Sequence, residues 1–428
     1  MLKNMVWGWD NGRALLGLAA IYAICWAVSE DRKRFPWRVV AGATGIQLAF
    51  ALLFYGVPVL RDGLAQGTAL MTALQEATRA GTNFVFGYIG DNSVSPLKGA
   101  DAPGPIFFFQ ILPLIIVVAS LSAILWHWRI LRWITKGFAF IFARTMGIGG
   151  ATSLVVTANV FMGMTEAPLL IKPYFARLTR SEIFIVMTAG FATIAAAVMA
   201  IYSSMLEPVM HNALPQLLIA SVMGATAAVA TALVIIPELT STKERSGEPD
   251  FKYHSTMDAF SQGAGDGMRM VINIAAMLIA ALALIYLVDA ILSVLPNVDG
   301  QPIKVQRILG WVFAPVMYML GIPWSEAQQA GGLMGEKTVL NEFVAYLDLS
   351  HVPVADMTDR TRRILANALC GFANLSSIGI IVGGLSIIAP DRREEFLGLA
   401  WKCLLAGTLA TCSSAAIIGA LPSALYAG

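Results

Sequence analysis

The chain has 428 residues, of which 57% are hydrophobic and 13% are charged, with a formal net charge of +2. A soluble domain carries roughly 25% charged residues, so this chain, with a mean hydropathy of +0.69, has too little polar surface to face water. We therefore predict a polytopic membrane protein. A nucleic-acid-binding protein is excluded, because the basic residues stand in short clusters between apolar segments.

Eight segments are long and apolar enough to cross a bilayer, which requires about 20 residues. They are residues 14–29, 39–60, 105–128, 183–206, 214–237, 268–295, 364–389 and 398–425. The basic cluster EDRKRFPWR follows the first segment, so the positive-inside rule predicts a cytoplasmic loop there and an N-terminus outside. An even number of crossings then puts the C-terminus outside as well, and only the cluster DRTRR opposes this orientation.

Two connecting stretches have a character of their own. Residues 61–104 are rich in glycine and only mildly apolar, which predicts an external loop or a helix lying on the surface. Residues 126–146 mix Trp and Phe with spaced Arg and Lys, a composition typical of a helix in the cytoplasmic membrane interface. A plain connecting helix is the alternative for both.

Two further apolar stretches, residues 149–172 and 324–347, are interrupted in the middle by glycine, proline or an acid. Their cores read NVFMGMTEAPLLIKPY and GGLMGEKTVLNEFVAY, so each has Met-Gly followed by a polar residue beside a glutamate. Each is followed by a crossing with a small polar break, AGFATIAAA in one case and CGFANLSSIG in the other. We expect an inverted repeat in which two re-entrant hairpins enter the bilayer from opposite sides.

Paired, interrupted segments in matching halves indicate the binding site of a secondary transporter. An acid inside the membrane costs at least ~2.5 kcal/mol, so Glu166 and Glu342 are functional candidates by default. The alternative is that each caps a helix or pairs with a buried cation, and Asn374, Ser376 and Ser377 can also serve only to hold helices together.

Other chemistries find little support. The stretch GGLMGEKT lacks the spacing of a phosphate-binding loop, so a solute or ion gradient is the expected energy source. An intramembrane enzyme would need a base or metal beside its nucleophile, and no His or Cys cluster offers one. The four cysteines lie in apolar segments and the four histidines are scattered, so neither disulfides nor a histidine metal site is expected. A channel would more often repeat one pore motif around an axis.

Four stretches together, GMTEAPLLIKPY, GAGDGMRMVINIAAMLIA, GEKTVLNEFVAY and CGFANLSSIGI, resemble the concentrative nucleoside transporter family. The similarity runs from about residue 35 to the C-terminus. It implies an all-α homotrimer in the inner (cytoplasmic) membrane, with eight transmembrane helices, two opposed re-entrant hairpins, and interfacial and external helices in each protomer. It also implies nucleoside import by alternating access.

The resemblance divides the chain into a scaffold, which also carries the trimer contacts, and a transport part in two halves. The division is 1–128 and 259–309 for the scaffold, 129–146 for the interfacial helix, 147–237 and 310–428 for the transport halves, and 238–258 for a cytoplasmic loop.

The resemblance also assigns roles to residues. Thr165 and Glu166 are expected to bind the nucleobase, and Val198 and Phe372 to line its pocket. The ribose hydroxyls are assigned to the polar set Asn341, Glu342, Asn374 and Ser377. Many relatives have Gln where this chain has Met164, and the Gly-Met pair at 163–164 resembles that of purine-preferring members. Purine nucleosides are therefore expected to be accepted. The alternative is that Met164 only fills space.

The family's sodium site maps to the Asn159 side chain and carbonyl, the Met162 carbonyl, the Thr193 hydroxyl and the Ile194 carbonyl. Such hard oxygen ligands from unwound backbone suit a small cation. We therefore expect Na⁺-coupled symport. Coupling to H⁺, with the proton on Glu166 or Glu342, is the alternative.

Overall fold

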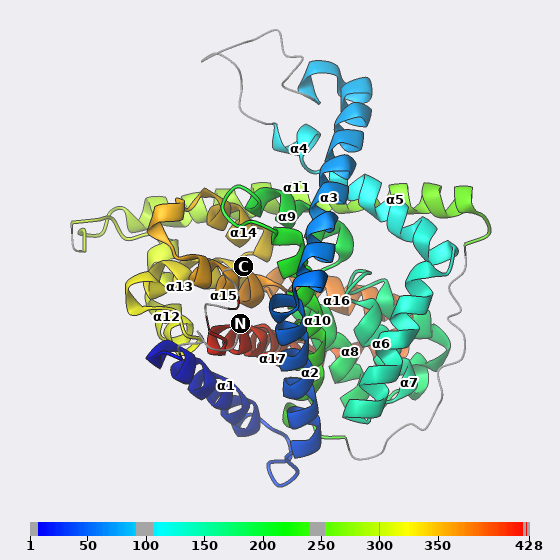
Figure 1. Ribbon diagram of the computed structural model, residues 1–428, viewed down its shortest axis with the longest axis horizontal. Helices are drawn as coiled ribbons and strands as arrows, with labels where there is room; N and C mark the ends of the chain where they lie inside the picture. The colour runs from blue at the N-terminus through cyan, green and yellow to red at the C-terminus, as the bar shows by residue number, and fades with distance from the viewer. Residues whose placement is uncertain (1–6, 91–105, 239–252, 299, 423–424, 426–428) are drawn as a thin grey trace.

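The computed structural model describes residues 7–90, 106–238, 253–298, 300–422 and 425 (Figure 1). This part of the chain is helical, with a single isolated bridge between Val298 and Gln301 in place of any strand, as the sequence predicts. The helices are α1 Trp9–Ala27, α2 Trp37–Gly56, α3 Pro58–Phe86, η2 Gly87–Ile89, α4 Phe107–Gln110, α5 Leu114–His127, α6 Ile130–Met146, α7 Gly150–Ala158, η5 Ala167–Arg177, α8 Arg180–Ala192, α9 Ala196–Leu206, α10 Ala213–Ile235, α11 Thr256–Leu292, α12 Val305–Met319, α13 Trp324–Val339, α14 Glu342–His351, η6 Val354–Asp356, α15 Asp359–Leu369, α16 Leu375–Ile388, η7 Pro390–Arg392 and α17 Arg393–Ala420.

Six of the eight predicted crossings coincide with helices that are long and apolar enough to span a bilayer. These are Trp37–Gly56, Phe107–His127, Arg180–Leu206, Ala213–Ile235, Thr256–Leu292 and Pro390–Ala420. The predicted crossing at 14–29 is met by helix α1, and that at 364–389 is divided between α15 and the short apolar α16. Helices α12 and α13 form a further apolar pair, bent by 119° between them.

The two halves of the predicted repeat share one order of elements. In the first, α7 and η5 form a broken pair, α8 and α9 form an interrupted helix, and α10 is long. In the second, α13 and α14, then α15 and α16, then α17 follow the same order. The interruptions fall at 193–195 and 370–374, where the sequence has its small polar breaks. Whether the two halves are inverted in a membrane stays a prediction.

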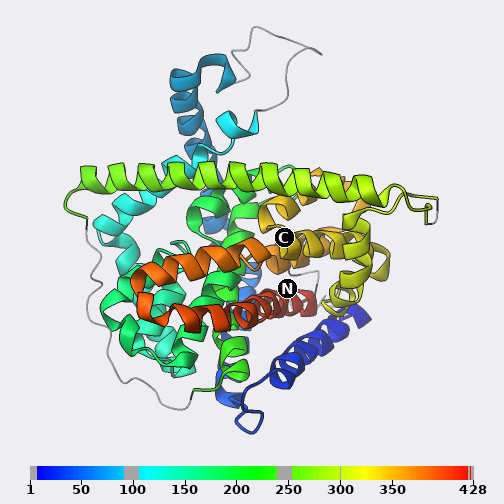
Figure 2. The same ribbon diagram turned by 180° about the vertical axis from the view of Figure 1, so that it is seen from behind.

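Helix α11 is the longest helix and crosses the whole body along one edge (Figures 1 and 2). Two glycines let it pack closely against α5: a Cβ on Gly263 would lie 2.8 Å from the Ser120 Cα, and one on Gly267 would lie 2.7 Å from the Ile116 Cα. Small residues at this spacing are typical of tight helix pairs in membranes. The outer face of α11 is apolar and exposed, as at Ile279 (72%), which suits lipid or a partner subunit.

The two unusual connecting stretches are helical in most of the part that the structure describes. Residues 61–86 belong to α3, so the loop alternative for them is wrong, and α3 projects beyond the rest of the body instead of lying along it (Figures 1 and 2). Helix α6 buries one stripe, including Leu131 and Phe142, and exposes Trp133 (83%) and Phe140 (73%) on the other. This amphipathic pattern suits the predicted membrane interface. Most of the predicted loop 238–258 lies outside the described residues.

The loop between α1 and α2 is tied to helices α8 and α17 by an ion-pair cluster. The Glu30 carboxylate accepts hydrogen bonds from Arg180 Nη2 at 3.1 Å and from Lys402 Nζ at 2.7 Å. Partial burial raises the pKa of Glu30, but the hydrogen bonds and positive charges of these two residues outweigh it and hold the pKa below its ordinary value. The ionised form of Glu30 is therefore the one that joins these three segments.

Candidate functional site

The two broken pairs and the two interrupted helices meet around one cavity of about 410 Å³. A volume of this size is within the range of small-molecule sites in proteins. All nine residues predicted to contact substrate line it: Met164, Thr165, Glu166, Val198, Asn341, Glu342, Phe372, Asn374 and Ser377. They come from segments that lie far apart in the sequence, so only the fold brings them together.

Glu342 is an acid held in a fixed orientation at one side of this cavity. Its side chain is buried, with 5% exposure, and its two carboxylate oxygens accept hydrogen bonds from Tyr202 Oη and from Asn374 Nδ2, each at 2.8 Å. A buried carboxylate that accepts two bonds has a defined orientation, and its remaining lone pairs can accept from a ligand. The geometry therefore suits recognition of a group that offers hydroxyl donors.

Two helix N-termini support this acid. Asn341 is the N-cap of α14 and accepts from Val344 N at 3.0 Å, and Asn374 is the N-cap of α16 and accepts from Ser377 N at 2.9 Å. Asparagine is among the preferred N-cap residues, because its side-chain oxygen satisfies an amide left free at the helix start. The bond from Ser377 also fixes which end of the Asn374 amide faces Glu342.

Tyr202 was missed by the sequence reasoning. It lies on α9, is 1% exposed, and packs against Phe343 and Tyr346 with ring centroids 5.7 Å and 4.6 Å away. The available signal was its position one helical turn after Val198, which puts both side chains on the same face of α9. A tyrosine inside an apolar helix needs a partner for its hydroxyl, and here the partner is Glu342.

The tip of the first broken pair packs into the rest of the site through two glycines. A Cβ on Gly190 of α8 would lie 2.9 Å from the Met164 Cβ, and a Cβ on Gly384 of α16 would lie 2.5 Å from the Thr165 Cγ2. Larger residues at these positions would push the tip away. Glu166 ends this tip, and its carboxylate accepts from Gly163 N at 3.3 Å.

One face of α11 forms the remaining wall of the cavity, which the sequence reasoning also missed. The residues are Asp266, Arg269, Met270, Asn273, Ile274 and Met277. Their spacing of three and four residues is that of a single helix face, and this was a readable signal within the motif GAGDGMRMVINIAAMLIA. Asp266 and Arg269 also form an exposed ion pair at 3.6 Å.

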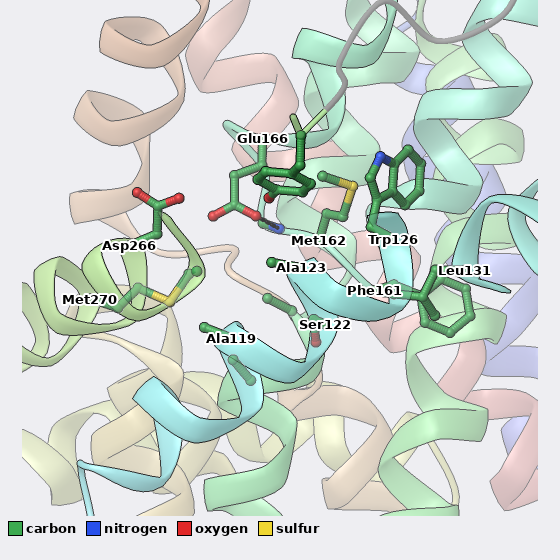
Figure 3. Close-up of a pocket in the computed structure, with 15 residues that line it drawn as sticks. Ala119, Ser122, Ala123, Trp126, Leu131, Phe161, Met162, Glu166, Asp266 and Met270 are labelled. Atoms are coloured by element: carbon green, nitrogen blue, oxygen red, sulfur yellow. Dashed lines mark hydrogen bonds between the residues drawn. The ribbon is translucent and has the colours of Figure 1, made fainter. Parts of the chain in front are cut away.

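A second, smaller cavity of about 60 Å³ lies between α5, α11 and the first tip, and Glu166 and Asp266 line both cavities (Figure 3). Figure 3 shows the two carboxylates turned toward the same gap, with Phe161, Met162 and Trp126 on the other side. A space of this size, with two carboxylates on an otherwise largely apolar wall, has room for ordered water. Glu166 is thus accessible from two sides.

The predicted sodium ligands lie at two adjacent breaks. Ala196 N donates to Phe161 O at 3.4 Å, which joins the turn after α7 to the turn between α8 and α9. At the first turn, both polar atoms of the Asn159 side chain are buried without a hydrogen-bond partner. At the second, the Thr193 hydroxyl donates to Ala189 O at 2.8 Å, which leaves its oxygen lone pairs free, and Ile194 O accepts a 3.4 Å bond from Ser221.

These groups fit an alkali cation. A buried amide without partners has a cost that a ligand can remove, and the donors here are neutral oxygens, which suit a hard monovalent ion. The described residues contain no cluster of His, Cys, Asp or Glu that could hold a transition metal.

Three family models together match most of the chain. They are the Na⁺-dependent nucleoside transporter N-terminus at residues 16–89, nucleoside recognition at 108–209, and the Na⁺-dependent nucleoside transporter C-terminus at 216–419. The nucleoside permease NupC of Helicobacter pylori is 34% identical over 95% of this chain and 96% of its own length. The chain belongs to the concentrative nucleoside transporter family. The transporter YutK of Bacillus subtilis, described as uncharacterized, is 36% identical over 97% of this chain and 99% of its own length.

Solved structures agree with this concentrative nucleoside transporter fold. CNTnw in an inward-facing, substrate-bound state is similar with a TM-score of 0.87 and 37% identity, over 97% of this chain and 99% of that one. A variant of CNTnw in an outward-facing state also gives 0.87, at 35% identity over 96% of this chain and 98% of that one. The family therefore consists of membrane transporters and not of enzymes, and its models name Na⁺ as the ion on which transport depends, as the sequence predicts.

Proposed function

We propose that this protein imports nucleosides by symport with Na⁺, and that the 410 Å³ cavity is its substrate site. The observation that carries the proposal is the buried carboxylate of Glu342, held by two donors at one side of this cavity. Ribose offers two adjacent hydroxyl donors, and bonds from a hydroxyl to a carboxylate are among the strong hydrogen bonds in proteins. Asn341, Asn374 and Ser377 surround the same point and complete the ribose end.

The nucleobase is assigned to the other end of the cavity. The Thr165 hydroxyl can donate and accept at a base edge, the Glu166 carboxylate can accept there, and Val198 and Phe372 supply apolar surface. A nucleoside is neutral and needs no cationic partner in the protein. A nucleotide would bring a phosphate toward Glu166 and Glu342 and is expected to be rejected for this reason.

We expect purine nucleosides to be accepted. Met164 takes the place of a polar side chain next to the base, and Met270 and Met277 line the facing wall. Thioether side chains are flexible and adapt to rings of different size. Adenosine, guanosine and inosine should therefore compete with radiolabelled uridine at least as well as cytidine does. Competition by cytidine alone would show that the methionines only fill space.

Coupling to Na⁺ is supported by the unpartnered Asn159 amide beside the substrate site. Asn159, Met162, Thr193 and Ile194 would hold the ion with their oxygens, and the ion would stabilise the two turns that bear the first tip and Val198. Because the substrate site and the ion site share these turns, the substrate and the ion would bind cooperatively. Proton coupling through Glu166 or Glu342 is the competing mechanism.

For transport, we propose that the two halves at 147–237 and 310–428 move together against a scaffold formed by 1–128 and 259–309, so that the cavity opens to each side in turn. We expect the protein to form a homotrimer in the cytoplasmic membrane, with both termini of each protomer outside. The broken pairs would then be the opposed re-entrant hairpins, with α6 at the cytoplasmic interface.

Uptake into proteoliposomes tests the proposal directly. Radiolabelled uridine should accumulate above its external concentration when an inward Na⁺ gradient is imposed, and a pH gradient without Na⁺ should have no such effect. Accumulation driven by the pH gradient alone would assign the coupling to H⁺. Equilibration without accumulation under either gradient would exclude a symporter.

A further inference from the structure

Helix α6 has one face that packs on the protein. Its buried residues recur at intervals of three or four, which places them on one side of the helix: Leu131, Thr135, Ala139, Phe142 and Met146. Next to this row, Phe138 stacks on Phe50 of α2 with the ring centroids 6.0 Å apart. This side of α6 is thus fixed to the body, and the other side is left to its surroundings.

The opposite face of α6 alternates cations with aromatic rings. Its residues are Arg129 at the N-cap, Trp133, Lys136, Phe140 and Arg144, all of them exposed and again at intervals of three or four. With about 3.6 residues per turn, this row lies across the helix from the buried row. We call these five residues the α6 stripe.

The sequence around the α6 stripe is basic and contains no acid. Between Asp101 and Glu166 the chain has no acidic residue, whereas α6 and its N-cap carry four basic residues. A concentration of one sign of charge on one face attracts partners of the opposite sign. The stripe is therefore complementary to an anionic partner.

The position of α6 in the chain points to a membrane surface. The segment Phe107–His127 is long and apolar enough to span a bilayer, and α6 begins at Ile130, directly after its end. Figure 1 shows α6 beside α7 at the edge of the body. Aromatic rings gather at the headgroup level of a bilayer, and basic residues there attract anionic lipids. A free phosphate ion would satisfy the cations but leave the exposed rings in water.

We propose that the α6 stripe binds the headgroups of anionic phospholipids, with Arg129 and Arg144 on phosphate oxygens and Trp133 and Phe140 between the headgroups. Arginine suits this role, because its guanidinium can bind a phosphate with two parallel hydrogen bonds. The two arginines stand at opposite ends of the stripe, about 22 Å apart along the helix axis, so they bind different lipid molecules. Helix α6 leads through the turn at Gly147 into α7, so these lipids lie at the base of the first broken pair.

Quenching of Trp133 fluorescence by brominated lipids tests the proposal. The full-length protein is placed in phosphatidylcholine vesicles that contain the same fraction of either brominated phosphatidylglycerol or brominated phosphatidylcholine. The Trp133 signal is the difference between the wild type and Trp133→Phe. Each basic residue near the surface favours an anionic lipid about fivefold, so phosphatidylglycerol should quench this signal severalfold more strongly. The excess should shrink at high salt, which screens the attraction.

Two double variants show whether the excess comes from the stripe. In Arg129→Gln/Arg144→Gln, the two lipids should quench Trp133 about equally. Lys33→Gln/Arg34→Gln is the matched control, because it removes two exposed charges from the loop between α1 and α2 and should keep the wild-type excess.

Three results would overturn the proposal. The first is equal quenching by both lipids in the wild type, and the second is an excess that survives in Arg129→Gln/Arg144→Gln or is lost equally in the control. The third is no quenching by either lipid, which would show that a neighbouring subunit or another protein surface covers the stripe. None of these measurements depends on transport, so they stand apart from the proposed function.

Discussion

Glu342→Gln removes one charge from the cavity and leaves the shape of the side chain almost unchanged. Asn374 must remain a donor, because its oxygen accepts from Ser377 N at 2.9 Å. The new glutamine would therefore turn its carbonyl oxygen to Asn374 and its amide nitrogen to Tyr202, whose hydroxyl can rotate to accept. The variant keeps a satisfied hydrogen-bond network, so we expect it to fold and to assemble normally.

The loss should appear in substrate binding. A hydrogen bond to a charged group contributes about 1.5–3 kcal/mol and a neutral one about 0.5–1.5 kcal/mol, so each ribose hydroxyl loses roughly 1–1.5 kcal/mol. Two hydroxyls lose about 2–3 kcal/mol, which corresponds to a rise in the uridine KM of roughly 30- to 150-fold at 1.4 kcal/mol for each factor of ten.

The assay is initial-rate uptake of radiolabelled uridine into proteoliposomes. Glu207→Gln is the matched control, because Glu207 does not line the cavity and its change should leave the KM unaltered. Size-exclusion chromatography in detergent checks that both variants assemble like the wild type. A uridine KM for Glu342→Gln within about threefold of the wild-type value, which is under 1 kcal/mol, would remove Glu342 from the ribose site.

Three further predictions concern other parts of the molecule. Asn159→Ala should raise the Na⁺ concentration needed for half-maximal uptake by about tenfold or more, because the ion loses one good oxygen ligand. An unchanged Na⁺ activation curve would place the ion elsewhere. Gly384→Ala should strongly lower uptake, because its Cβ would lie 2.5 Å from Thr165 Cγ2, whereas Gly383→Ala, which meets nothing within 4 Å, should be active. Because the pKa of Glu30 is lowered in the folded state, its contribution to stability is present above the unfolded pKa and is lost as the pH falls through the folded pKa. The Tm difference between wild type and Glu30→Gln should accordingly be largest near about pH 7 and vanish in acid, and a constant difference would contradict the assigned ion pair.

Most of the fold could be predicted because membrane helices follow from local composition. The exceptions depend on caps and breaks. Helix α11 begins at Thr256 instead of near residue 268, because Ser255 accepts a hydrogen bond from Asp258 N and starts the helix in a polar stretch. Residues 364–389 contain a helix end, a break at 370–374 and a new helix, which a hydropathy average cannot separate.

The candidate site divides in a similar way. Residues at the breaks, such as Glu166 and Asn374, stand out in the sequence because polar groups are costly in a membrane, and the structure brings them to one cavity. Tyr202 and the α11 wall do not stand out, because tyrosine and methionine are ordinary in apolar helices.

The two bonds at Glu342 have a mechanical consequence. Tyr202 belongs to the first half of the repeat, and Asn374 to the second, yet both hold the same carboxylate at 2.8 Å. A hydrogen bond is lost once its atoms separate by about 1 Å more, so the halves cannot slide past each other without breaking one of these bonds. None of the six α11 residues in the cavity wall bonds to that carboxylate among the described contacts. In the proposed transport cycle, a solute bound to that carboxylate would therefore travel with the two halves while the α11 wall stays behind.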